Sequence, residues 1–456
     1  MSRLLLAFSQ LILVSATAQT DLHSLQQQFE DLRFGMFIHF NIPTYANQDW
    51  PDPDASPDLF NPVRLDCTQW AKAAQSAGMT YGCLTTKHHS GFCIWDTRTT
   101  DYNVMHSPLR RDVVREFTEA FRARGLKVFL YYSILDTHHK IRPGQITQKD
   151  VDMIKAQLTE LLTNYGPITA LIIDGWDAPW SRISYDDVPF EDIYRLIKTL
   201  QPDCLVMDLN SAKYPAEALM YTDIKSYELG AGQHISKETN RLPALTCLPL
   251  NSAWFWKTDF PTTPTKNPDT LVDDLLTPLN NAWCNFILNV APNRDGLIDQ
   301  NALDALAAIG RKWKNPGPVA PLPPGVPPII SPNLAKRQAA NASWSDDMDI
   351  MDFGNDDNFR SSWVSNPTVQ HPWYEIDFGR DRSFNMAVIT GAHITRYRLE
   401  YYESGTWTII VPNGDDSTHV KIHRFSRVWG SRVRILIDGF SGQPSIAEFG
   451  VYDERR

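Results

Sequence analysis

The chain has few cysteines, no run of basic residues and no glycine-rich phosphate loop, and each absence argues against a class of function. Its six cysteines form no Cys-x-x-Cys pair, so a cysteine zinc site is disfavoured and buried free thiols are expected. No glycine-rich loop of the nucleotide or dinucleotide type follows any predicted strand. Net charge is −10 without a basic patch, which disfavours a nucleic-acid partner.

The sequence also lacks an apolar run long enough to cross a bilayer. Residues 1–18 instead have the features of a secretory signal, with Arg3, the apolar stretch Leu4–Val14 and the small residues Ala16-Thr17-Ala18. No cysteine follows this segment, which argues against a lipid anchor. We therefore expect a mature chain that begins at Gln19 and is secreted or periplasmic.

A proline-rich segment at residues 315–332 divides the rest of the chain. Such a segment cannot be a helix or a central strand, and it predicts an extended linker between residues 19–314 and residues 333–456.

Strand-like and helix-like patterns alternate before this linker. The predicted strands are residues 34–40, 81–86, 126–132, 168–174, 204–209, 223–227 and 285–290. The predicted helices are residues 65–77, 112–124, 149–164, 190–200, 271–280 and 301–313. This alternation indicates a parallel sheet, and the length favours an α/β fold of the closed (β/α)8-like barrel type. After the linker, short alternating runs separated by turn residues predict an antiparallel β-sandwich.

Polar residues gather where predicted strands end. His39 lies near the end of one predicted strand, His88 and His89 follow the next, and Asp174 ends the apolar run Leu171-Ile-Ile. Because the carboxyl ends of barrel strands share one face, these side chains are expected to meet there in an active site.

Two carboxylates could support glycoside hydrolysis. Asp174 is the candidate nucleophile, because a carboxylate at the end of a buried strand is costly without a function or a partner. A retaining glycosidase needs a second carboxyl about 5–5.5 Å away as acid and base. Glu228, at another strand end, is preferred, and Glu217 is the alternative.

Histidines and tryptophans would complete a sugar pocket, because imidazoles bond hydroxyls and aromatic rings stack on a pyranose. The candidate platforms are Trp50, Trp95, Trp176, Trp254 and Trp256. A zinc site built from His39, His88 and His89 is the alternative use of the histidines. Their adjacent spacing differs from the i, i+4 spacing of zinc proteases, so we expect no metal and no cofactor.

Five segments occur in an order and spacing that resembles glycoside hydrolase family 29, the α-L-fucosidases. They are Phe34-Gly-Met-Phe-Ile-His39-Phe, Lys87-His-His-Ser-Gly-Phe, Leu130-Tyr-Tyr-Ser133, Leu171-Ile-Ile-Asp-Gly175 and Ile287-Leu-Asn-Val-Ala-Pro-Asn-Arg-Asp-Gly296. The resemblance covers roughly residues 30–314 and implies a (β/α)8-like barrel and a retaining reaction.

The resemblance also implies residue roles. Asp174 corresponds to the nucleophile, and the sugar contacts correspond to His39, Asp49, Trp50, His88, His89 and Tyr131. Many members carry glutamate where this chain has Asp49. The acid/base segment Thr222-Asp-Ile-Lys-Ser-Tyr-Glu228 is only similar to the family's pattern, so the choice between Glu228 and Glu217 stays open. Trp176 and Trp256 are added from the aromatic pattern.

The region after the linker resembles a discoidin-like domain of the coagulation factor V/VIII C type. The matching segments are Asp356-Asp-Asn-Phe-Arg-Ser-Ser-Trp363, Trp373-Tyr-Glu-Ile-Asp-Phe-Gly379, Tyr397-Arg-Leu-Glu-Tyr-Tyr and Ile446-Ala-Glu-Phe-Gly-Val-Tyr452. This resemblance implies a jelly-roll sandwich that either binds a second glycan or only stabilises the protein.

Together these features predict a secreted, retaining exo-α-L-fucosidase that acts on fucosylated oligosaccharides or glycoconjugates without a cofactor. The alternatives are a catalytically silent fucose- or glycan-binding protein and a hydrolase with side activity on α-L-galactosides, which differ from fucosides by one hydroxyl.

Overall fold

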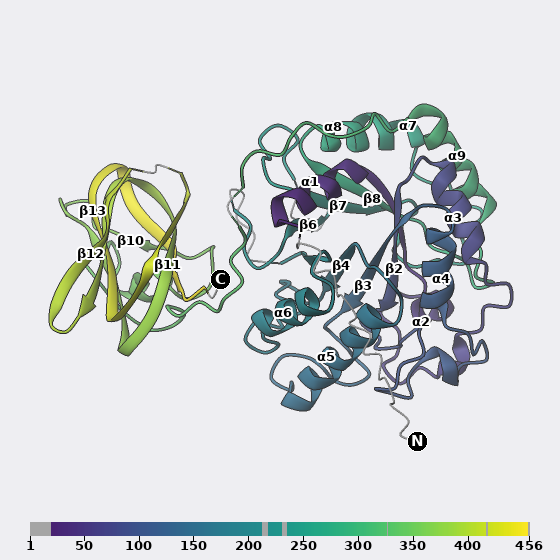
Figure 1. Ribbon diagram of the computed structural model, residues 1–456, viewed down its shortest axis with the longest axis horizontal. Coiled ribbons are helices and arrows are strands. Elements are labelled where there is room, and N and C mark those ends of the chain that lie inside the picture. The colour runs from purple at the N-terminus through teal and green to yellow at the C-terminus, as the bar shows by residue number, and fades with distance from the viewer. Residues whose placement is uncertain (1–19, 212–217, 230–234, 326, 416–417, 455–456) are drawn as a thin grey trace, which may run out of the picture.

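The computed structural model describes residues 20–211, 218–229, 235–325, 327–415 and 418–454. Figure 1 shows two bodies, a barrel surrounded by helices and a curled antiparallel sheet beside it. The barrel is closed, with eight parallel strands in sequence order and β8 paired to β1. The predicted α/β barrel followed by an antiparallel sandwich is confirmed. The predicted signal segment lies outside the described residues.

The barrel strands are short and almost wholly buried. They are β1 (Phe34–Ile38), β2 (Tyr81–Lys87), β3 (Lys127–Ser133), β4 (Ala170–Asp174), β5 (Leu205–Leu209), β6 (Ile224–Glu228), β7 (Ala244–Pro249) and β8 (Cys284–Asn289). Seven of them overlap the predicted strands, and β7 was not predicted.

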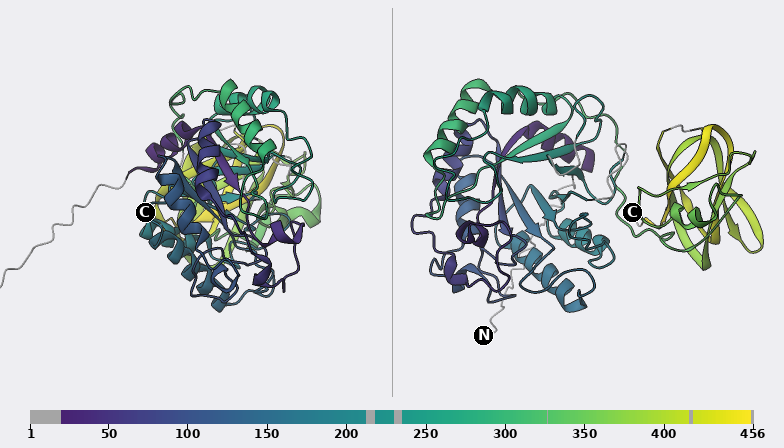
Figure 2. Two further views of the ribbon diagram at one scale, coloured as in Figure 1. Left: turned by 90° about the vertical axis from the view of Figure 1, so that its right-hand side faces the viewer. Right: turned by 180° about the vertical axis from the view of Figure 1, so that it is seen from behind.

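Helices cover the outside of the barrel (Figures 1 and 2). The α-helices are α1 (Leu22–Leu32), α2 (Ile42–Ala46), α3 (Cys67–Ser76), α4 (Val113–Arg122), α5 (Gln148–Thr163), α6 (Phe190–Leu200), α7 (Pro268–Thr270), α8 (Thr277–Asn280) and α9 (Gln300–Lys312). Short 3-10 helices are η1 (Pro57–Leu59), η2 (Val104–His106) and η4 (Met348–Gly354), and a π-helical segment, η3 (Leu271–Leu276), joins α7 to α8.

Side-chain caps explain where several helices begin. The carboxylate of Asp66 accepts a hydrogen bond from the amide of Gln69 at 3.0 Å, and α3 starts directly after Asp66. Asp112 caps α4 in the same way through the amide of Arg115 at 2.9 Å. Gly78 adopts a φ of +78° after α3, a left-handed conformation that glycine accepts at little cost.

The barrel interior is a packed apolar core, and α1 closes its N-terminal end. Phe29 of α1 belongs to the same buried cluster as the inward-facing side chains of the strands. Gln26 donates to the carbonyl of Asp223 at 2.7 Å, and Glu30 accepts from the amide of Ala244 at 2.8 Å. Because α1 blocks this end, the opposite, C-terminal end is the open one.

The C-terminal sheet contains β9 (Ala339–Ala342), β10 (Trp363–Val364), β11 (Trp373–Glu403), β12 (Thr406–Gly414) and β13 (Val420–Tyr452). The two long strands β11 and β13 pair antiparallel along much of their length and curl around one apolar core. All six cysteines are buried free thiols, as expected. Among the described residues, no helix is long and apolar enough to span a bilayer.

Candidate active site

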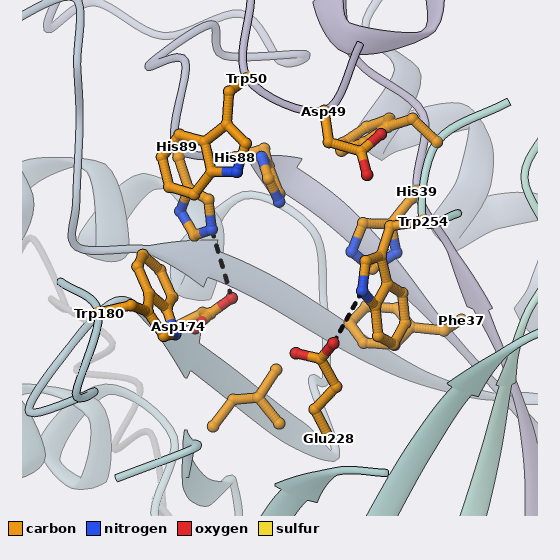
Figure 3. A pocket seen from close by; sticks show the side chains of 12 residues that line it. Phe37, His39, Asp49, Trp50, His88, His89, Asp174, Trp180, Glu228 and Trp254 are labelled. Carbon is orange, nitrogen blue, oxygen red and sulfur yellow. Dashed lines mark hydrogen bonds and ion pairs between the residues drawn. The ribbon is translucent and has the colours of Figure 1, made fainter. Parts of the chain in front are cut away.

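A cavity of about 350 Å³ opens at the C-terminal end of the barrel strands, within the usual size range of ligand pockets. Figure 3 shows the side chains that line it. They are Phe37, His39, Asp49, Trp50, His88, His89, Asp174, Trp180, Leu209, Glu228, Trp254 and Phe255. The strand-end histidines and both preferred carboxylates therefore meet in one place.

Asp174 is the last residue of β4 and is only 6% exposed. The hydroxyl of Tyr131 donates to its Oδ2 at 2.7 Å, and the backbone amide of Gly175 donates to its Oδ1 at 2.6 Å. Gly175 has a φ of +70°, and a Cβ there would lie 2.9 Å from that of Leu135. Glycine is therefore needed for the chain to turn sharply after the carboxylate.

The electrostatic environment of Asp174 is a balance of opposing effects. Burial raises its pKa to about 7, and the charge of Glu228 adds to this shift. The two hydrogen bonds from Tyr131 and Gly175 oppose the shift, because they favour the ionised carboxylate. Near neutral pH this group can exist in either protonation state.

The three cavity histidines are neutral near pH 7. Burial lowers the pKa of His39 and of His89 to about 3, and it lowers that of His88 as well. His89 Nε2 lies 3.7 Å from Asp174 Oδ2, and with a neutral ring this is a polar contact and no ion pair.

Hydrogen bonds outside the cavity orient two of these rings. His39 Nδ1 lies 2.8 Å from Asn289 Oδ1, whose amide nitrogen donates to the carbonyl of Trp254. His89 Nδ1 lies 2.7 Å from Ser133 Oγ, which donates onward to the carbonyl of Leu135. In both pairs Nδ1 is therefore the donor, and each Nε2 is an acceptor.

Glu228 ends β6 and faces Asp174 across the cavity (Figure 3). The indole of Trp254 donates to its Oε1 at 3.0 Å, and the side-chain amide of Asn210 donates to its Oε2 at 3.1 Å. The competing residue Glu217 lies outside the described residues. Asn210 was not anticipated from the sequence, because its contact depends on how the chain turns after β5.

Aromatic side chains form the mouth of the cavity. Trp50 is 54% exposed and stacks on His89 with ring centroids 4.8 Å apart, and Trp180 is 43% exposed and meets Trp50 edge-on. Trp180 was not predicted. Its place four residues after Trp176, in the loop that follows β4, is the only sequence signal for it.

The structure does not bring every predicted residue into the cavity. Trp176 turns away, stacks on Phe190 and donates to the carbonyl of Val188, so it packs the loop and does not line the cavity. Trp256 donates to Asp299 at 2.6 Å and is likewise absent from the lining. Tyr131 is absent from the lining and lies behind it, where its hydroxyl donates to Asp174 and its ring packs against His39 and His88.

Asp49 lines the cavity and forms an ion pair with Lys257, whose Nζ lies 2.7 Å from Asp49 Oδ1. Within the described ranges, no group of three or more His, Cys, Asp or Glu side chains has the geometry to hold a metal ion. The arrangement can therefore supply carboxylates for proton transfer or attack, and neutral donors and acceptors for hydroxyl groups.

Sequence comparison identifies the family. A family model described as Alpha-L-fucosidase matches residues 44–317, which is more than half of the chain. The chain belongs to the α-L-fucosidase family. It is thus a glycoside hydrolase of that family, glycoside hydrolase family 29. A second model, described as the F5/8 type C domain, matches residues 335–449, which is the discoidin-like region.

Relatives of similar length support this assignment. The chain is 28% identical over 463 residues to a protein named Putative alpha-L-fucosidase 1 from Oryza sativa subsp. japonica. This alignment covers 94% of this chain and 84% of that protein. It is 27% identical over 466 residues to Alpha-L-fucosidase 1 from Arabidopsis thaliana, with coverages of 95% and 87%.

Solved structures show the same fold. Alpha-L-fucosidase isoenzyme 1 from Paenibacillus thiaminolyticus superposes with a TM-score of 0.56 and 24% identity, and the match covers 92% of this chain and all of that one (100%). A putative alpha-L-fucosidase from Bacteroides thetaiotaomicron gives a TM-score of 0.54 and 22% identity, with coverages of 94% and 97%.

Proposed function

We propose that this member of the family is a secreted, retaining exo-α-L-fucosidase that removes terminal α-L-fucose from oligosaccharides or glycoconjugates. One observation carries the proposal: Asp174 and Glu228 line the same cavity, together with neutral histidines, aromatic rings and the ion-paired carboxylate of Asp49. A pair of carboxyl groups facing each other across a sugar-sized space is what a glycosidase requires.

In the proposed mechanism Asp174 attacks the anomeric carbon while Glu228 protonates the departing oxygen. The carbon–oxygen bond to the leaving group breaks as the bond to Asp174 forms, which gives a glycosyl-enzyme ester. Glu228 then takes a proton from water, the water oxygen attacks the same carbon, and the ester bond breaks. Both inversions together retain the configuration of the sugar.

The remaining lining residues are proposed to bind the sugar. Neutral His39, His88 and His89 can each exchange hydrogen bonds with hydroxyl groups, and the carboxylate of Asp49 can accept one. The ring of Trp50 offers an apolar face to the sugar. Tyr131 acts through Asp174, whose carboxylate it holds in place.

Two parts of the proposal concern regions outside the cavity. Residues 1–18 have the charge, apolar length and small residues of an export signal, which supports a secreted or periplasmic protein. The discoidin-like region is proposed to contact a second glycan, because domains of this type include carbohydrate-binding modules.

Asp174→Ala tests the proposal. The variant is expected to fold normally and to lose activity on an aryl α-L-fucoside by orders of magnitude, because it lacks the carboxylate proposed to form the glycosyl-enzyme. Proton NMR of the first sugar released by the wild-type protein should show the α-anomer. Retained activity of Asp174→Ala would remove this residue from its role.

Rescue experiments identify the acid/base. Azide should restore turnover of Glu228→Ala on an activated aryl fucoside, because the small anion replaces the water that needs a base. Rescue of Glu217→Ala instead would transfer the role. Wild-type protein that binds L-fucose but releases no product from fucosylated oligosaccharides would support the catalytically silent alternative, and turnover of an α-L-galactoside would measure the side activity.

A further inference from the structure

Asn210 lies directly after β5 and contacts Glu228 twice. Its Oδ1 accepts a hydrogen bond from the backbone amide of Glu228 at 2.8 Å, and its Nδ2 donates to the carboxylate Oε2 at 3.1 Å. Asn210 is only 4% exposed, so water does not compete freely for these bonds. One amide therefore fixes both the backbone and the side chain of the proposed acid/base.

The backbone around Asn210 explains why a side chain is needed there. The last backbone pair of the β5–β6 ladder is Leu209 with Ser226, and the amide of Asn210 still donates to the carbonyl of Ser226 at 3.0 Å. At Asn210 the chain then turns with a φ of +65° and leaves the sheet. Its side-chain amide takes the place that the next peptide group of β5 would occupy and satisfies the amide of Glu228.

A second neutral donor holds the other carboxyl oxygen. The indole of Trp254 donates to Oε1 of Glu228 at 3.0 Å, from the loop after β7. With one donor on each oxygen, the plane of the carboxyl group is set. Asp174 faces this carboxyl group across the cavity, and the two interact electrostatically.

We propose that Asn210 is a positioning residue for proton transfer by Glu228, an inference that rests on the proposed glycosidase function. In the first step the proton must move from Glu228 to the departing oxygen as the glycosidic bond breaks. In the second step it must move from water to the same carboxylate. Asn210 is absent from the cavity lining, and it acts by keeping the carboxyl group of Glu228 aimed at the departing oxygen and at the water.

A positioning role predicts that the loss of activity depends on the leaving group, whereas a general loss of structure would lower activity on every substrate alike. A sugar alcohol leaves only when it is protonated, whereas a dinitrophenolate leaves without a proton. The value of kcat/KM reports events up to the first irreversible step, which is formation of the glycosyl-enzyme. A misaligned acid should therefore lower kcat/KM for an oligosaccharide and spare it for a dinitrophenyl fucoside.

The first variant is Asn210→Gly, because glycine adopts the left-handed backbone without strain and removes only the side chain. For a fucosylated oligosaccharide we expect kcat/KM to fall about 10–100-fold, the effect of misplacing a general acid. For 2,4-dinitrophenyl α-L-fucoside we expect a change of less than about threefold. With that substrate kcat should fall, because the second step still needs the base, and azide should restore it.

The second variant, Asn210→Asp, separates the two contacts. Aspartate can still accept from the amide of Glu228, but it cannot donate to Oε2 and places a negative charge beside it. We expect the same dependence on the leaving group as for Asn210→Gly. Lys140→Gly is the control, because Lys140 also has a positive φ, of 60°, and is exposed outside the cavity lining.

Each outcome is decisive. Equal losses on both substrates, or none, in Asn210→Gly would overturn the inference, and so would wild-type behaviour of Asn210→Asp. Wild-type protein inactive on both substrates would instead refute the proposed function. Glu228→Gln provides the reference, since it should show the same dependence on the leaving group in a stronger form. If it does not, Glu228 is not the acid and the inference fails with it.

Discussion

At the scale of single residues, burial determines the protonation states of the titratable side chains in the cavity. Asp174 and the three histidines lie in the same low-polarity space, and burial favours the neutral form of each. The carboxylate retains part of its acidity because Tyr131 and Gly175 donate hydrogen bonds to it. For the histidines burial outweighs any opposing contact and lowers the pKa, so of these four groups Asp174 is the one with a pKa near neutrality.

The pH dependence of kcat/KM should follow from this difference. The proposed nucleophile must be ionised, and its pKa is about 7 in the empty cavity, so kcat/KM should fall tenfold per pH unit below about pH 7. His39 and His89, with pKa values of about 3, should add no limb in this range. Measurement with 2,4-dinitrophenyl α-L-fucoside isolates the acid limb, and return of each sample to neutral pH controls for denaturation. A limb near pH 4 would contradict the effect of burial.

The pH dependence of protein stability should report the titration of Asp174 independently of activity. The folded-state pKa of about 7 lies above the ordinary 3.8, so between these values the folded protein holds the proton more tightly than the unfolded chain. The stabilising contribution of the neutral acid is complete below about pH 3.8 and is lost as the pH rises through about 7. The Tm difference between Asp174→Asn and wild type should therefore grow in favour of the variant from about pH 4 to about pH 8.

Thermal unfolding measured across this range tests the sign. Asp203→Asn, which removes a charge from an exposed position, serves as the matched control. A Tm difference that stays flat with pH, or one that falls, would show that Asp174 is not buried as the structure has it.

At the scale of elements, the sequence predicted strand bounds more accurately where an apolar run is followed by a polar residue or a glycine. The first four barrel strands were predicted within a few residues for this reason. The missed strand β7 reads Ala-Leu-Thr-Cys-Leu-Pro, which neither alternates nor ends in a typical strand residue. Helix α1 was missed because it is rich in glutamine, and its burial comes from contacts with strands far along the chain.

The site shows the same limit. Asp174 and the histidines could be placed from the sequence because each lies at the end of a strand or directly after it, and the strand ends of a barrel meet. Trp176 was misjudged because the turn at Gly175 sends its side chain into the loop and brings Trp180 to the cavity instead. Loop conformation also decided that Asn210 would reach Glu228. The position of a loop side chain is thus set by the turn that precedes it, and the pattern of a single sequence does not reveal the conformation of that turn.

A buried ion pair links the end of β2 to the loop after β3. Lys87, the residue before the paired histidines, lies 3.3 Å from Asp136, and both side chains are fully buried at 0% exposure. Asp136 also accepts from the amide and the ring of His139. This network holds the segment that carries His88 and His89.

Lys87→Met should lower the free energy of unfolding by about 3–5 kcal/mol, because it leaves the buried carboxylate of Asp136 without its ion-pair partner. Denaturant titration measures the change. Arg64→Met is the matched control, since its partner Asp295 lies on the surface, with side-chain exposures of 63% and 43%, and such pairs contribute less than about 1 kcal/mol. Equal small effects would mean that the Lys87–Asp136 pair is hydrated.

At the scale of the whole molecule, the curled sheet is packed against the barrel. Met386, Val388, Val420 and Tyr452 belong to the same buried apolar cluster as the outer layer of the barrel. Tyr452 is hydrogen-bonded to Tyr221, and Lys336 pairs with Asp186 at 2.6 Å. The two bodies shown in Figure 1 should therefore lose their structure together.

Calorimetry of the full chain tests this coupling. Wild type should give one unfolding transition, and Val388→Asp, which places a charge in the shared cluster, should split it into two. Ile409→Asp, at a position 53% exposed on the C-terminal sheet, should keep one transition. Two transitions in the wild type would show that the contact contributes little.

The helix that closes the N-terminal end of the barrel has a consequence for synthesis. Its contacts with Asp223, Ala244 and Asn285 bridge 197, 214 and 256 positions of sequence. Such non-local contacts cannot form until the later strands have left the ribosome, and they slow folding. Helix α1 is therefore synthesised early but packs late. Its apolar face stays exposed until about two hundred further residues have been translated.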